Sequence, residues 1–320
     1  MRAVQILATG GPEVLRVADL PEPQPGPTDV VVDVVAAGVN FIDTYHRSGM
    51  YPVPLPLVLG SEGAGRVRTV GAEVSDLAPG DLVAWQGTPG SYAEQVRVPV
   101  ARLVPVPDGV PDQVAGALLL QGLTAHYLCR STYEVQEGDT VVVHAGAGGV
   151  GLLLTQLVRA RGGHVISTVS TPEKAELSRG AGAEHVVGYD DLAATVRDIT
   201  GGVGVPAVYD GVGAATFETS LTCLRRRGIE VLFGASSGPV PPFDLQRLNP
   251  AGSLFVTRPT VGDYVATRAE LLWRAGELFE AVLAGTLHVR IGATYPLDQA
   301  RAAHEALEGR RTTGKVLLLP

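Results

Sequence analysis

A glycine-rich turn between a strand pattern and a helix pattern, at residues 140–151, constrains the fold more than any other segment. The run Val141–Val143 is β-branched, an apolar helix pattern follows, and the glycines between them are spaced as Gly146-x-Gly148-x-x-Gly151. In a dinucleotide-binding fold these glycines permit a tight turn, close approach of the backbone to a pyrophosphate, and close helix–strand packing. The helix N-terminus supplies N–H groups and partial positive charge. The alternative is an ordinary turn in a chain with 40 glycines, but the flanking strand and helix favour a dinucleotide.

Strands and helices alternate from about residue 122 onward, which predicts a parallel sheet with helices on both faces. The preceding part is rich in strands and in Pro and Gly turns, which predicts an irregular β-barrel. The tail breaks the alternation, and we expect it to return to the first domain. The prediction is an α/β chain of two domains, 1–121 with 258–320 and 122–257. Expected helices are 40–47, 149–161, 172–180, 190–199, 215–225, 267–283 and 297–308, and expected strands are 30–35, 65–70, 82–85, 92–98, 140–144, 164–169, 185–188, 205–209, 229–233, 253–256, 288–295 and 315–319.

Charge, hydropathy and cysteine content exclude several function classes. The formal net charge of −8 argues against general affinity for nucleic acid. No apolar run reaches the length of about 18 residues that a membrane span needs, and Met1–Leu7 resembles a first strand rather than a signal peptide. Cys129 and Cys223 are too few for a disulfide framework or a four-cysteine zinc site. We therefore expect buried thiols and a cytoplasmic protein.

The end of the second predicted strand of the nucleotide domain bears on which nucleotide binds. An acidic residue there accepts hydrogen bonds from the ribose 2′-hydroxyl and repels a 2′-phosphate. This chain has the neutral Ser170, and Lys174, one of only two lysines, follows near the start of the next helix. A cation beside an uncharged strand end suits a phosphate, which favours NADP(H) over NAD(H). The alternative is that Lys174 is simply a solvated helix residue.

Several longer segments match one known family. On these segments the chain resembles the zinc-free quinone oxidoreductases of the medium-chain dehydrogenase/reductase superfamily, the group that also contains zeta-crystallin. The resemblance implies a GroES-like catalytic domain built from both chain ends, a Rossmann domain between them, NADPH as cofactor, and a homodimer. The matching segments are Gly38–Tyr45, Arg47–Pro52, Ala145–Gly151, Val208–Asp210, Phe233–Gly238 and Val256–Pro259.

The residues at the positions of a catalytic zinc indicate chemistry without a metal. Zinc-using relatives carry a cysteine where this chain has Asn40, and Gly-His-Glu where it has Gly60-Ser61-Glu62. Amide and hydroxyl groups are poor zinc ligands compared with thiolate and imidazole. We therefore expect no metal, and we interpret Glu62 as a structural acid rather than a base.

The resemblance also implies the residues of the reaction site. Asn40, Tyr45 and Tyr51 would line the pocket near the nicotinamide. There Asn40 can donate a hydrogen bond to a developing oxyanion, and either tyrosine can stack on a flat ring or donate a proton. The alternative for Tyr45 is packing in the core. Asp43 either orients its neighbours or faces solvent, and Thr124 either lies near the nicotinamide or caps a helix.

The family's cofactor-binding pattern falls on the glycine loop, the strand ends and the tail. Tyr189 would approach the 2′-phosphate or the adenine, and Arg310 would reach the 2′-phosphate from the tail, with Arg311 as the alternative. The implied set is Asn40, Thr124, Gly146, Gly148, Gly149, Val150, Gly151, Ser170, Lys174, Tyr189, Val212, Phe233, Gly234, Ser236, Val256 and Arg310.

These observations favour an NADPH-dependent, zinc-independent quinone reductase. A quinone accepts hydride readily because reduction makes its ring aromatic, so the enzyme mainly has to align donor and acceptor and exclude water. One- and two-electron reduction both stay open. The alternatives are reduction of an activated C=C bond in alkenals or enones, and a crystallin-like NADPH-binding protein without turnover, a kind that includes RNA-binding relatives. The expected partners are a small electrophilic substrate and a second copy of the chain, with no nucleic acid and no membrane.

Overall fold

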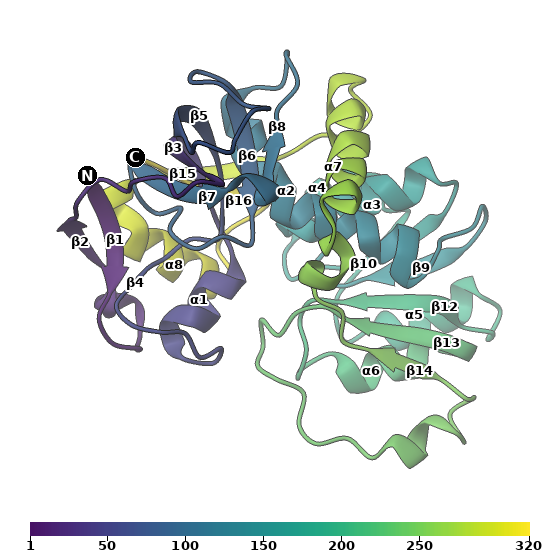
Figure 1. Cartoon of the computed structure of the whole chain (residues 1–320). Helices are drawn as coiled ribbons and strands as arrows, with labels where there is room; N and C mark the ends of the chain where they lie inside the picture. Colours follow the sequence, from purple (N-terminus) through teal and green to yellow (C-terminus); the bar gives the residue numbers. More distant parts are fainter. The chain divides into compact units, whose positions relative to one another are not determined.

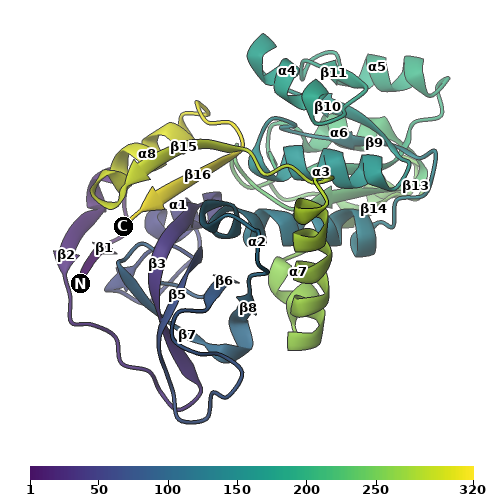
Figure 2. The same ribbon diagram turned by 90° about the horizontal axis from the view of Figure 1, so that it is seen from above.

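The computed structural model describes residues 1–320, which divide by their contacts into two compact units. Unit 1 consists of Met1–Leu123, Val265–Gly285 and Val289–Pro320, and unit 2 of Thr124–Tyr264 and Thr286–His288. Both chain ends therefore belong to unit 1, and the glycine loop belongs to unit 2. Figures 1 and 2 show the elements of each unit from two directions. The domain boundaries after residues 121 and 257 stay a prediction.

Unit 1 is built on two sheets. The larger has seven strands in the order β15-β16-β3-β5-β6-β8 with β7 paired to β3, and the smaller has the order β2-β1-β4. β15 and β16 pair in parallel, and the other pairs are antiparallel. The strands are β1 Arg2–Ile6, β2 Arg16–Asp19, β3 Asp29–Val39, β4 Leu57–Val58, β5 Glu62–Val70, β6 Leu82–Gln86, β7 Gln95–Pro99, β8 Leu103–Pro105, β15 Ile291–Pro296 and β16 Lys315–Leu319.

The long strand β3 organises the core of unit 1. Its almost continuous run of valine and alanine is buried on both faces, and it pairs with β16, β5 and β7. Trp85, Tyr92 and Leu103 are fully buried in the same unit. The helices are α1 Phe41–Ser48, α2 Asp112–Tyr127, which continues into unit 2 after Leu123, α7 Arg268–Leu283 and α8 Ala300–Glu308, with single 3-10 turns at Pro12–Val14, Val100–Arg102 and Leu297–Gln299. A further 3-10 turn, Val261–Val265, belongs to unit 2 up to Tyr264.

Unit 2 contains a six-stranded parallel sheet in the order β11-β10-β9-β12-β13-β14. Counted from the first strand of the unit, this is the order 3-2-1-4-5-6 of a doubly wound dinucleotide-binding fold. Helices α3 and α4 lie on one face of the sheet, and α5 and α6 lie on the other (Figure 1). The strands are β9 Thr140–Val143, β10 His164–Thr168, β11 His185–Val187, β12 Val205–Asp210, β13 Leu224–Leu232 and β14 Phe255–Thr257, and the helices are α3 Gly149–Ala160, α4 Pro172–Gly180, α5 Leu192–Ile199 and α6 Phe217–Cys223, with a π-helical turn at Leu128–Thr132 and a 3-10 turn at Leu245–Leu248.

The predicted α/β class is confirmed, but one helix–strand boundary is wrong. The helix expected over 215–225 ends at Cys223, and β13 begins at Leu224 instead of residue 229. Arginine favours helices, which is why Arg225–Arg227 suggested one. In the structure Arg227 takes a φ of 59°, and the pairing of β12 with β13 shifts register here. The stretch therefore joins the strand through a bulge.

One expectation from composition is confirmed by the structure. Cys129 and Cys223 are both buried free thiols, as predicted. No helix combines the length and the apolar character that crossing a bilayer requires.

Candidate functional site

The glycine loop of unit 2 joins the end of β9 to the first turn of α3. A Cβ on Gly146 would lie 1.7 Å from Ser167 Oγ, and one on Gly151 would lie 2.5 Å from the carbonyl oxygen of Ala145. Both positions therefore require glycine for the protein's own packing. A Cβ on Gly148 would meet its nearest neighbour, the same carbonyl oxygen, at 3.1 Å. The fold restricts Gly148 less, so the lack of a side chain there matters mainly for a close-lying ligand.

The first turn of α3 offers backbone donors at this loop. Gly148 is the N-cap and Gly149 the first helical residue. The N–H groups of Gly149, Val150 and Gly151 have no carbonyl one turn earlier within the helix, and they lie at the positive end of the helix dipole. This loop fits a pyrophosphate, and all the glycine-loop residues of the predicted set lie in it.

Ser170 and Lys174 lie together just beyond the end of β10. Thr171 caps α4, and its Oγ1 accepts a hydrogen bond from the Lys174 backbone N–H at 3.3 Å. The lysine side chain folds back so that its Nζ donates to Ser170 Oγ at 3.4 Å. An ammonium beside a hydroxyl at the ribose position is a small anion-binding pair, which fits a 2′-phosphate better than a 2′-hydroxyl.

Tyr189 lies over the same edge of the sheet because it stacks on a buried histidine. Its ring is parallel to that of His144, with an interplanar angle of 3° and centroids 5.9 Å apart. His144 Nδ1 pairs with Thr168 Oγ1 at 2.9 Å and Nε2 with Ser220 Oγ at 3.0 Å. Burial lowers the pKa of His144, which favours the neutral ring. The histidine therefore acts as a fixed platform for Tyr189.

Asp210 holds together the loops that follow β12 and β13. Its Oδ1 accepts the backbone N–H groups of Val212 and Gly213 at 2.6 and 3.0 Å, and its Oδ2 accepts the Thr216 hydroxyl at 2.6 Å. A Cβ on Gly234 would lie 2.5 Å from the Gly211 carbonyl oxygen, so the two loops are in close contact. Predicted cofactor residues on these loops and on the neighbouring strand β14 are Val212, Phe233, Gly234, Ser236 and Val256.

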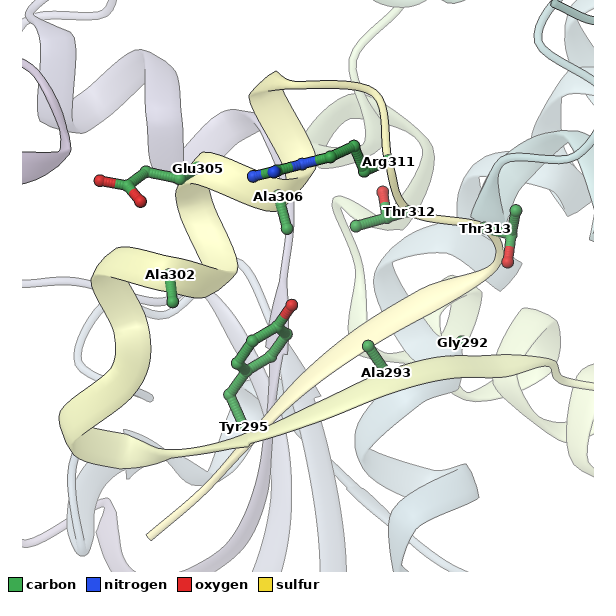
Figure 3. Close-up of a pocket in the computed structure, with 9 residues that line it drawn as sticks. All are labelled: Gly292, Ala293, Tyr295, Ala302, Glu305, Ala306, Arg311, Thr312 and Thr313. Atoms are coloured by element: carbon green, nitrogen blue, oxygen red, sulfur yellow. The ribbon is translucent and has the colours of Figure 1, made fainter. Parts of the chain in front are cut away.

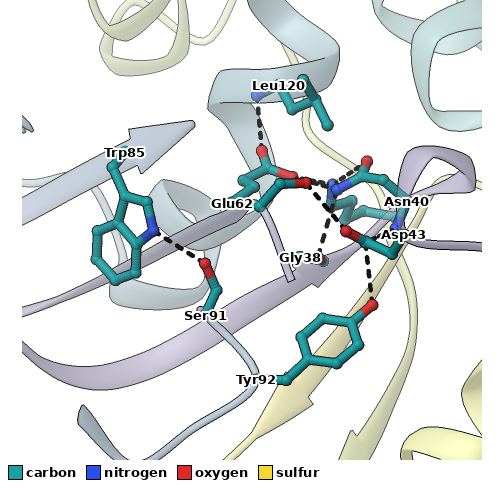
Figure 4. Close-up of polar contacts among 10 residues, drawn as sticks. Gly38, Asn40, Asp43, Glu62, Trp85, Ser91, Tyr92 and Leu120 are labelled. Carbon is teal, nitrogen blue, oxygen red and sulfur yellow. Dashed lines mark hydrogen bonds and ion pairs between the residues drawn. The ribbon is translucent and has the colours of Figure 1, made fainter. Parts of the chain in front are cut away.

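In unit 1, Asn40 precedes α1 and lies in a buried polar network (Figure 4). Its Nδ2 donates to Glu62 Oε2 at 2.9 Å and to the Gly38 carbonyl oxygen at 3.3 Å, and its backbone N–H donates to Asp43 Oδ2 at 2.8 Å. Only 6% of the residue is exposed. Both amide hydrogens thus have a partner, the longer contact being to Gly38.

Asp43 is fully buried and organises its surroundings. Besides the Asn40 backbone N–H it accepts the hydroxyls of Ser61 and Tyr92, both at 3.0 Å. Burial raises the pKa of Asp43 to about 6, although these hydrogen bonds and the Lys315 charge act in the opposite direction. Of the two alternatives drawn from the sequence, orientation of the neighbours agrees with this geometry, and exposure to solvent does not.

The two predicted tyrosines are in contact but differ in exposure. The rings of Tyr45 and Tyr51 meet edge to face with centroids 5.2 Å apart. Tyr45 lies on α1 and is buried, whereas 37% of Tyr51 is exposed. Their arrangement leaves Tyr51 as the more accessible ring.

The remaining predicted residues are spread over both units. Thr124 lies on the part of α2 that belongs to unit 2, and Arg310 follows α8 in unit 1 with a φ of 54°. Arg311 borders a pocket of about 390 Å³ between α8 and β15, and Figure 3 shows its side chain directed along α8 toward Glu305. Other lining residues are Gly292, Ala293, Tyr295, Ala302, Ala306, Thr312 and Thr313.

Comparisons with known proteins identify the family. The model described as "Alcohol dehydrogenase GroES-like domain" matches residues 26–108, and that described as "Zinc-binding dehydrogenase" matches residues 149–272. A quinone oxidoreductase from Pseudomonas aeruginosa is 47% identical over 323 aligned positions, covering 100% of this chain and 99% of the relative. This chain belongs to the quinone oxidoreductases of the medium-chain dehydrogenase/reductase superfamily. The predicted family and the predicted pairing of GroES-like and Rossmann folds are confirmed.

A solved structure and a further relative are also similar to this chain. The crystal structure of Escherichia coli quinone oxidoreductase complexed with NADPH has a TM-score of 0.98 at 42% identity, covering 100% of each chain. A 2-haloacrylate reductase from a Burkholderia species is 41% identical, covering 99% of this chain and 98% of the relative.

The residues of this quinone oxidoreductase do not fit a catalytic zinc ion, although one matching model describes a zinc-binding dehydrogenase. Lys315 Nζ lies 2.8 Å from Asn40 Oδ1, and the Ser61 hydroxyl donates to Asp43. An ammonium on the amide oxygen repels a metal cation at the same place. Nowhere do three His, Cys, Asp or Glu side chains gather as a metal site.

The sequence did not identify Lys315 as a residue of this site, and it did not predict that Glu62 is buried in an ion pair. Lys315 is 1% exposed and Glu62 is fully buried, and the two form an ion pair. The available signal was a lone lysine at the head of the apolar strand Val316–Leu319, since a lysine in such a strand is seldom buried without a partner.

A series of buried hydrogen bonds, which the sequence did not reveal, links α1 to α8. Arg47 donates through Nη1 to His304 Nδ1 at 3.0 Å and is paired with Glu308 at 2.7 Å. Because arginine only donates, Nδ1 of His304 must accept, so Nε2 carries the hydrogen and faces the Tyr92 hydroxyl at 3.1 Å. That hydroxyl in turn donates to Asp43. The chain of donors therefore ends on Asp43.

Proposed function

We propose that this quinone oxidoreductase reduces quinones with NADPH by bringing the nicotinamide ring and the acceptor together in a site without a metal. The observation that carries the proposal is the Ser170–Lys174 pair beside the glycine loop, because it combines a pyrophosphate site with a cation at the ribose position. NADPH supplies the hydride, and a proton from solvent completes the reduction of a quinone to the hydroquinone. The similarity to a protein solved with NADPH supports the same cofactor here.

In this proposal the residues of unit 2 hold the nucleotide. The loop Gly146–Gly151 binds the pyrophosphate through backbone N–H groups, and Ser170 and Lys174 bind the 2′-phosphate. Tyr189, fixed by its stack on His144, packs on the adenosine. Val212, Phe233, Gly234, Ser236 and Val256 complete the contacts from the ends of neighbouring strands. We propose Arg310 as the tail residue at the 2′-phosphate, because Arg311 borders the pocket beside α8.

The residues of unit 1 are proposed to bind and orient the acceptor. Asn40 donates to an acceptor oxygen, and Tyr51, with Tyr45 packed against it, stacks on a flat ring. Asp43 holds the backbone of Asn40 and does not itself meet the acceptor. Thr124 is proposed to contact the nicotinamide from α2.

The decisive experiment is a paired assay of NADPH oxidation with 1,4-naphthoquinone and with an alkenal. We expect turnover with the quinone, a higher kcat/KM for it than for the alkenal, and a lower KM for NADPH than for NADH. Binding of NADPH without oxidation by any acceptor would support a crystallin-like binding protein instead.

Reduction of an activated C=C bond is the second candidate, favoured by the similarity to a 2-haloacrylate reductase. A hydride delivered to the β-carbon of an enone or acrylate also leaves negative charge on an oxygen, which the same donor can stabilise. A higher kcat/KM for the alkenal in the paired assay would make this the principal activity.

We further propose a homodimer and a cytoplasmic location. β14 is the last strand of the unit 2 sheet, and Phe255 on it is 57% exposed. An open strand edge with an exposed aromatic residue suits pairing with the same edge of a second copy.

The two buried thiols suit a reducing compartment. We also retain 122–257 as the extent of the Rossmann domain.

A further inference from the structure

The side-chain amide of Asn40 is held by a buried ion pair between Lys315 and Glu62. Lys315 Nζ donates to Asn40 Oδ1 at 2.8 Å and also contacts Glu62 Oε2. That carboxylate accepts Asn40 Nδ2 at 2.9 Å, and its other oxygen accepts the Leu120 backbone N–H at 2.7 Å. Lys315 is 1% exposed and Glu62 is fully buried. We call Asn40, Glu62 and Lys315 the Asn40 triad.

Gly38 provides the space for the Asn40 triad. A Cβ on Gly38 would lie 2.3 Å from Glu62 Oε2 and 2.7 Å from Lys315 Nζ. The backbone of β3 can therefore pass beside both charges only because this residue has no side chain. Its carbonyl oxygen also accepts the second Nδ2 hydrogen of Asn40, at 3.3 Å. The local backbone is shaped around the ion pair.

Stability alone is a weak explanation for this arrangement. Burying two charges costs desolvation energy that apolar residues of similar size avoid, so buried ion pairs often contribute nothing net. Their effect on Asn40 is specific, however. An ammonium group has only donors, so Lys315 can face only the amide oxygen, which turns Nδ2 toward Glu62 and Gly38. A cation on the amide oxygen also polarises the amide and strengthens its N–H groups as donors.

We propose that Lys315 is a positioning residue of the reaction: it orients and polarises the Asn40 amide so that the N–H now held at 3.3 Å by Gly38 serves the acceptor oxygen. The other N–H stays committed to Glu62. In this role Lys315 touches neither acceptor nor cofactor and acts only through Asn40. The inference rests on the proposed function, because that function makes Asn40 the donor to the acceptor.

The test compares charge variants of the Asn40 triad in the full-length protein. The double variant Lys315→Met with Glu62→Gln removes both charges at similar volume and leaves no single buried charge. Glu62→Gln alone keeps the ammonium on Asn40 Oδ1 but removes its carboxylate partner, so thermal unfolding is measured first to establish that this variant is folded. We expect the double variant to lose about tenfold to a hundredfold in kcat with 1,4-naphthoquinone. Its KM for NADPH should change less than about twofold. The single variant should keep at least about ten times the kcat of the double variant. Arg301→Met, which removes an exposed cation paired with Glu305, is the matched control.

Coupling to Asn40 separates positioning from a structural role. In an Asn40→Ala background, removing the ion pair should cost no further kcat, because the cation then has no amide to act through. Equal kcat for the double variant and Glu62→Gln, or a further loss in the Asn40→Ala background, overturns the inference.

An NMR measurement makes the inference independent of turnover. The Asn40 side-chain amide signals, assigned by their loss in Asn40→Ala, should exchange slowly with solvent in the wild type and faster in the double variant. If none of the acceptors tested supports NADPH oxidation by the wild type, the proposed function fails. The Asn40 amide signals alone then decide whether the ion pair orients Asn40. Unchanged exchange in the double variant overturns the inference in that case.

Discussion

At the scale of single residues, the choice between NADPH and NADH depends on Lys174. Its ammonium lies 3.4 Å from Ser170 Oγ, the position at which we propose that the 2′-phosphate binds. We predict that Lys174→Ala raises the KM for NADPH about tenfold, the effect of losing about 1.4 kcal/mol of charge-assisted binding. The KM for NADH should stay within about twofold, because NADH has no 2′-phosphate. Steady-state kinetics with both cofactors measure this difference.

Arg179→Ala is the matched control for Lys174. Arg179 lies on the same helix and is paired with Glu176 at the surface. It should leave both KM values unchanged. An equal rise for NADPH and NADH in Lys174→Ala would show that the lysine stabilises α4 rather than the phosphate.

Groupings of residues that are close in the sequence could be predicted, whereas contacts between residues far apart in the sequence could not. Ser170 and Lys174 are four positions apart and Gly146–Gly151 is one continuous loop, so spacing alone indicated that the members of each group lie together. Lys315 meets Asn40 across a separation of 275 positions. The apolar strand that follows Lys315 indicates that this lysine has a partner, but a single sequence does not identify which residue the partner is.

At the scale of elements, the turn from β9 to α3 separates glycines needed by the fold from a glycine needed by the ligand. We predict that Gly146→Ala destabilises the protein and abolishes NADPH binding, because the new Cβ would lie 1.7 Å from Ser167 Oγ. Gly148→Ala should fold, since its nearest contact is 3.1 Å, yet bind NADPH at least about tenfold more weakly because the pyrophosphate must approach this backbone. Thermal unfolding with and without NADPH measures both effects.

Gly180→Ala at the end of α4 is the control, because a Cβ there meets no atom within 4 Å. It should leave binding unchanged and keep or slightly raise the melting temperature. Normal NADPH affinity in Gly148→Ala would contradict the assignment of this loop to the pyrophosphate.

The contact between α1 and α8 contains two groups with opposite pH dependence. Burial, together with the Arg47 charge, lowers the pKa of His304 from 6.5 to about 3, and burial raises that of Asp43 from 3.8 to about 6. Between about pH 3 and pH 6.5, His304 is protonated only in the unfolded state, so its contribution to the free energy of unfolding is lost as pH falls. The folded state alone protonates Asp43 between pH 3.8 and about 6, so that contribution is lost as pH rises. In the overlapping range the two slopes cancel.

We predict that His304→Gln exposes the Asp43 slope. Relative to the wild type, the free energy of unfolding of the variant should fall by about 1.4 kcal/mol for each unit of pH increase between about pH 4 and 6. Asp43→Asn should show the reverse slope. Urea unfolding followed by tryptophan fluorescence reports unit 1 alone, because both tryptophans, Trp85 and Trp273, belong to it. His185→Gln removes an exposed histidine on β11 of unit 2, and this control should parallel the wild type at every pH. A flat difference between His304→Gln and the wild type would contradict the prediction.

Element types followed from periodicity, whereas some boundaries depended on contacts. Alternation of strands and helices predicted the doubly wound sheet of unit 2, because each element there buries a face next to its neighbours in sequence. Arg225–Arg227 has helix propensity but joins β13, since pairing with β12 and β14 outweighs propensity. The same limit explains why the seven-stranded sheet of unit 1, which joins β16 to β3, was expected only as an irregular barrel.

At the scale of the whole molecule, the open edge of the unit 2 sheet leads to a prediction about assembly. β14 pairs only with β13, so its other edge has backbone groups without a strand partner, and Phe255 exposes 57% of its surface there. Antiparallel pairing of two β14 strands across a twofold axis would satisfy both edges at once and leave no open end, which limits assembly to a dimer. We predict that the wild type sediments as a dimer and that Phe255→Asp shifts it to a monomer, because two carboxylates would face each other across the axis.

Leu245→Asp is the control, since Leu245 is 68% exposed but lies outside the strand edge. NADPH binding should survive in the Phe255→Asp monomer, because the glycine loop and the Ser170–Lys174 pair lie on β9, β10 and their helices, at a distance of several strands from β14 in the sheet order. A Phe255→Asp protein that still sediments as a dimer would assign the interface to another surface.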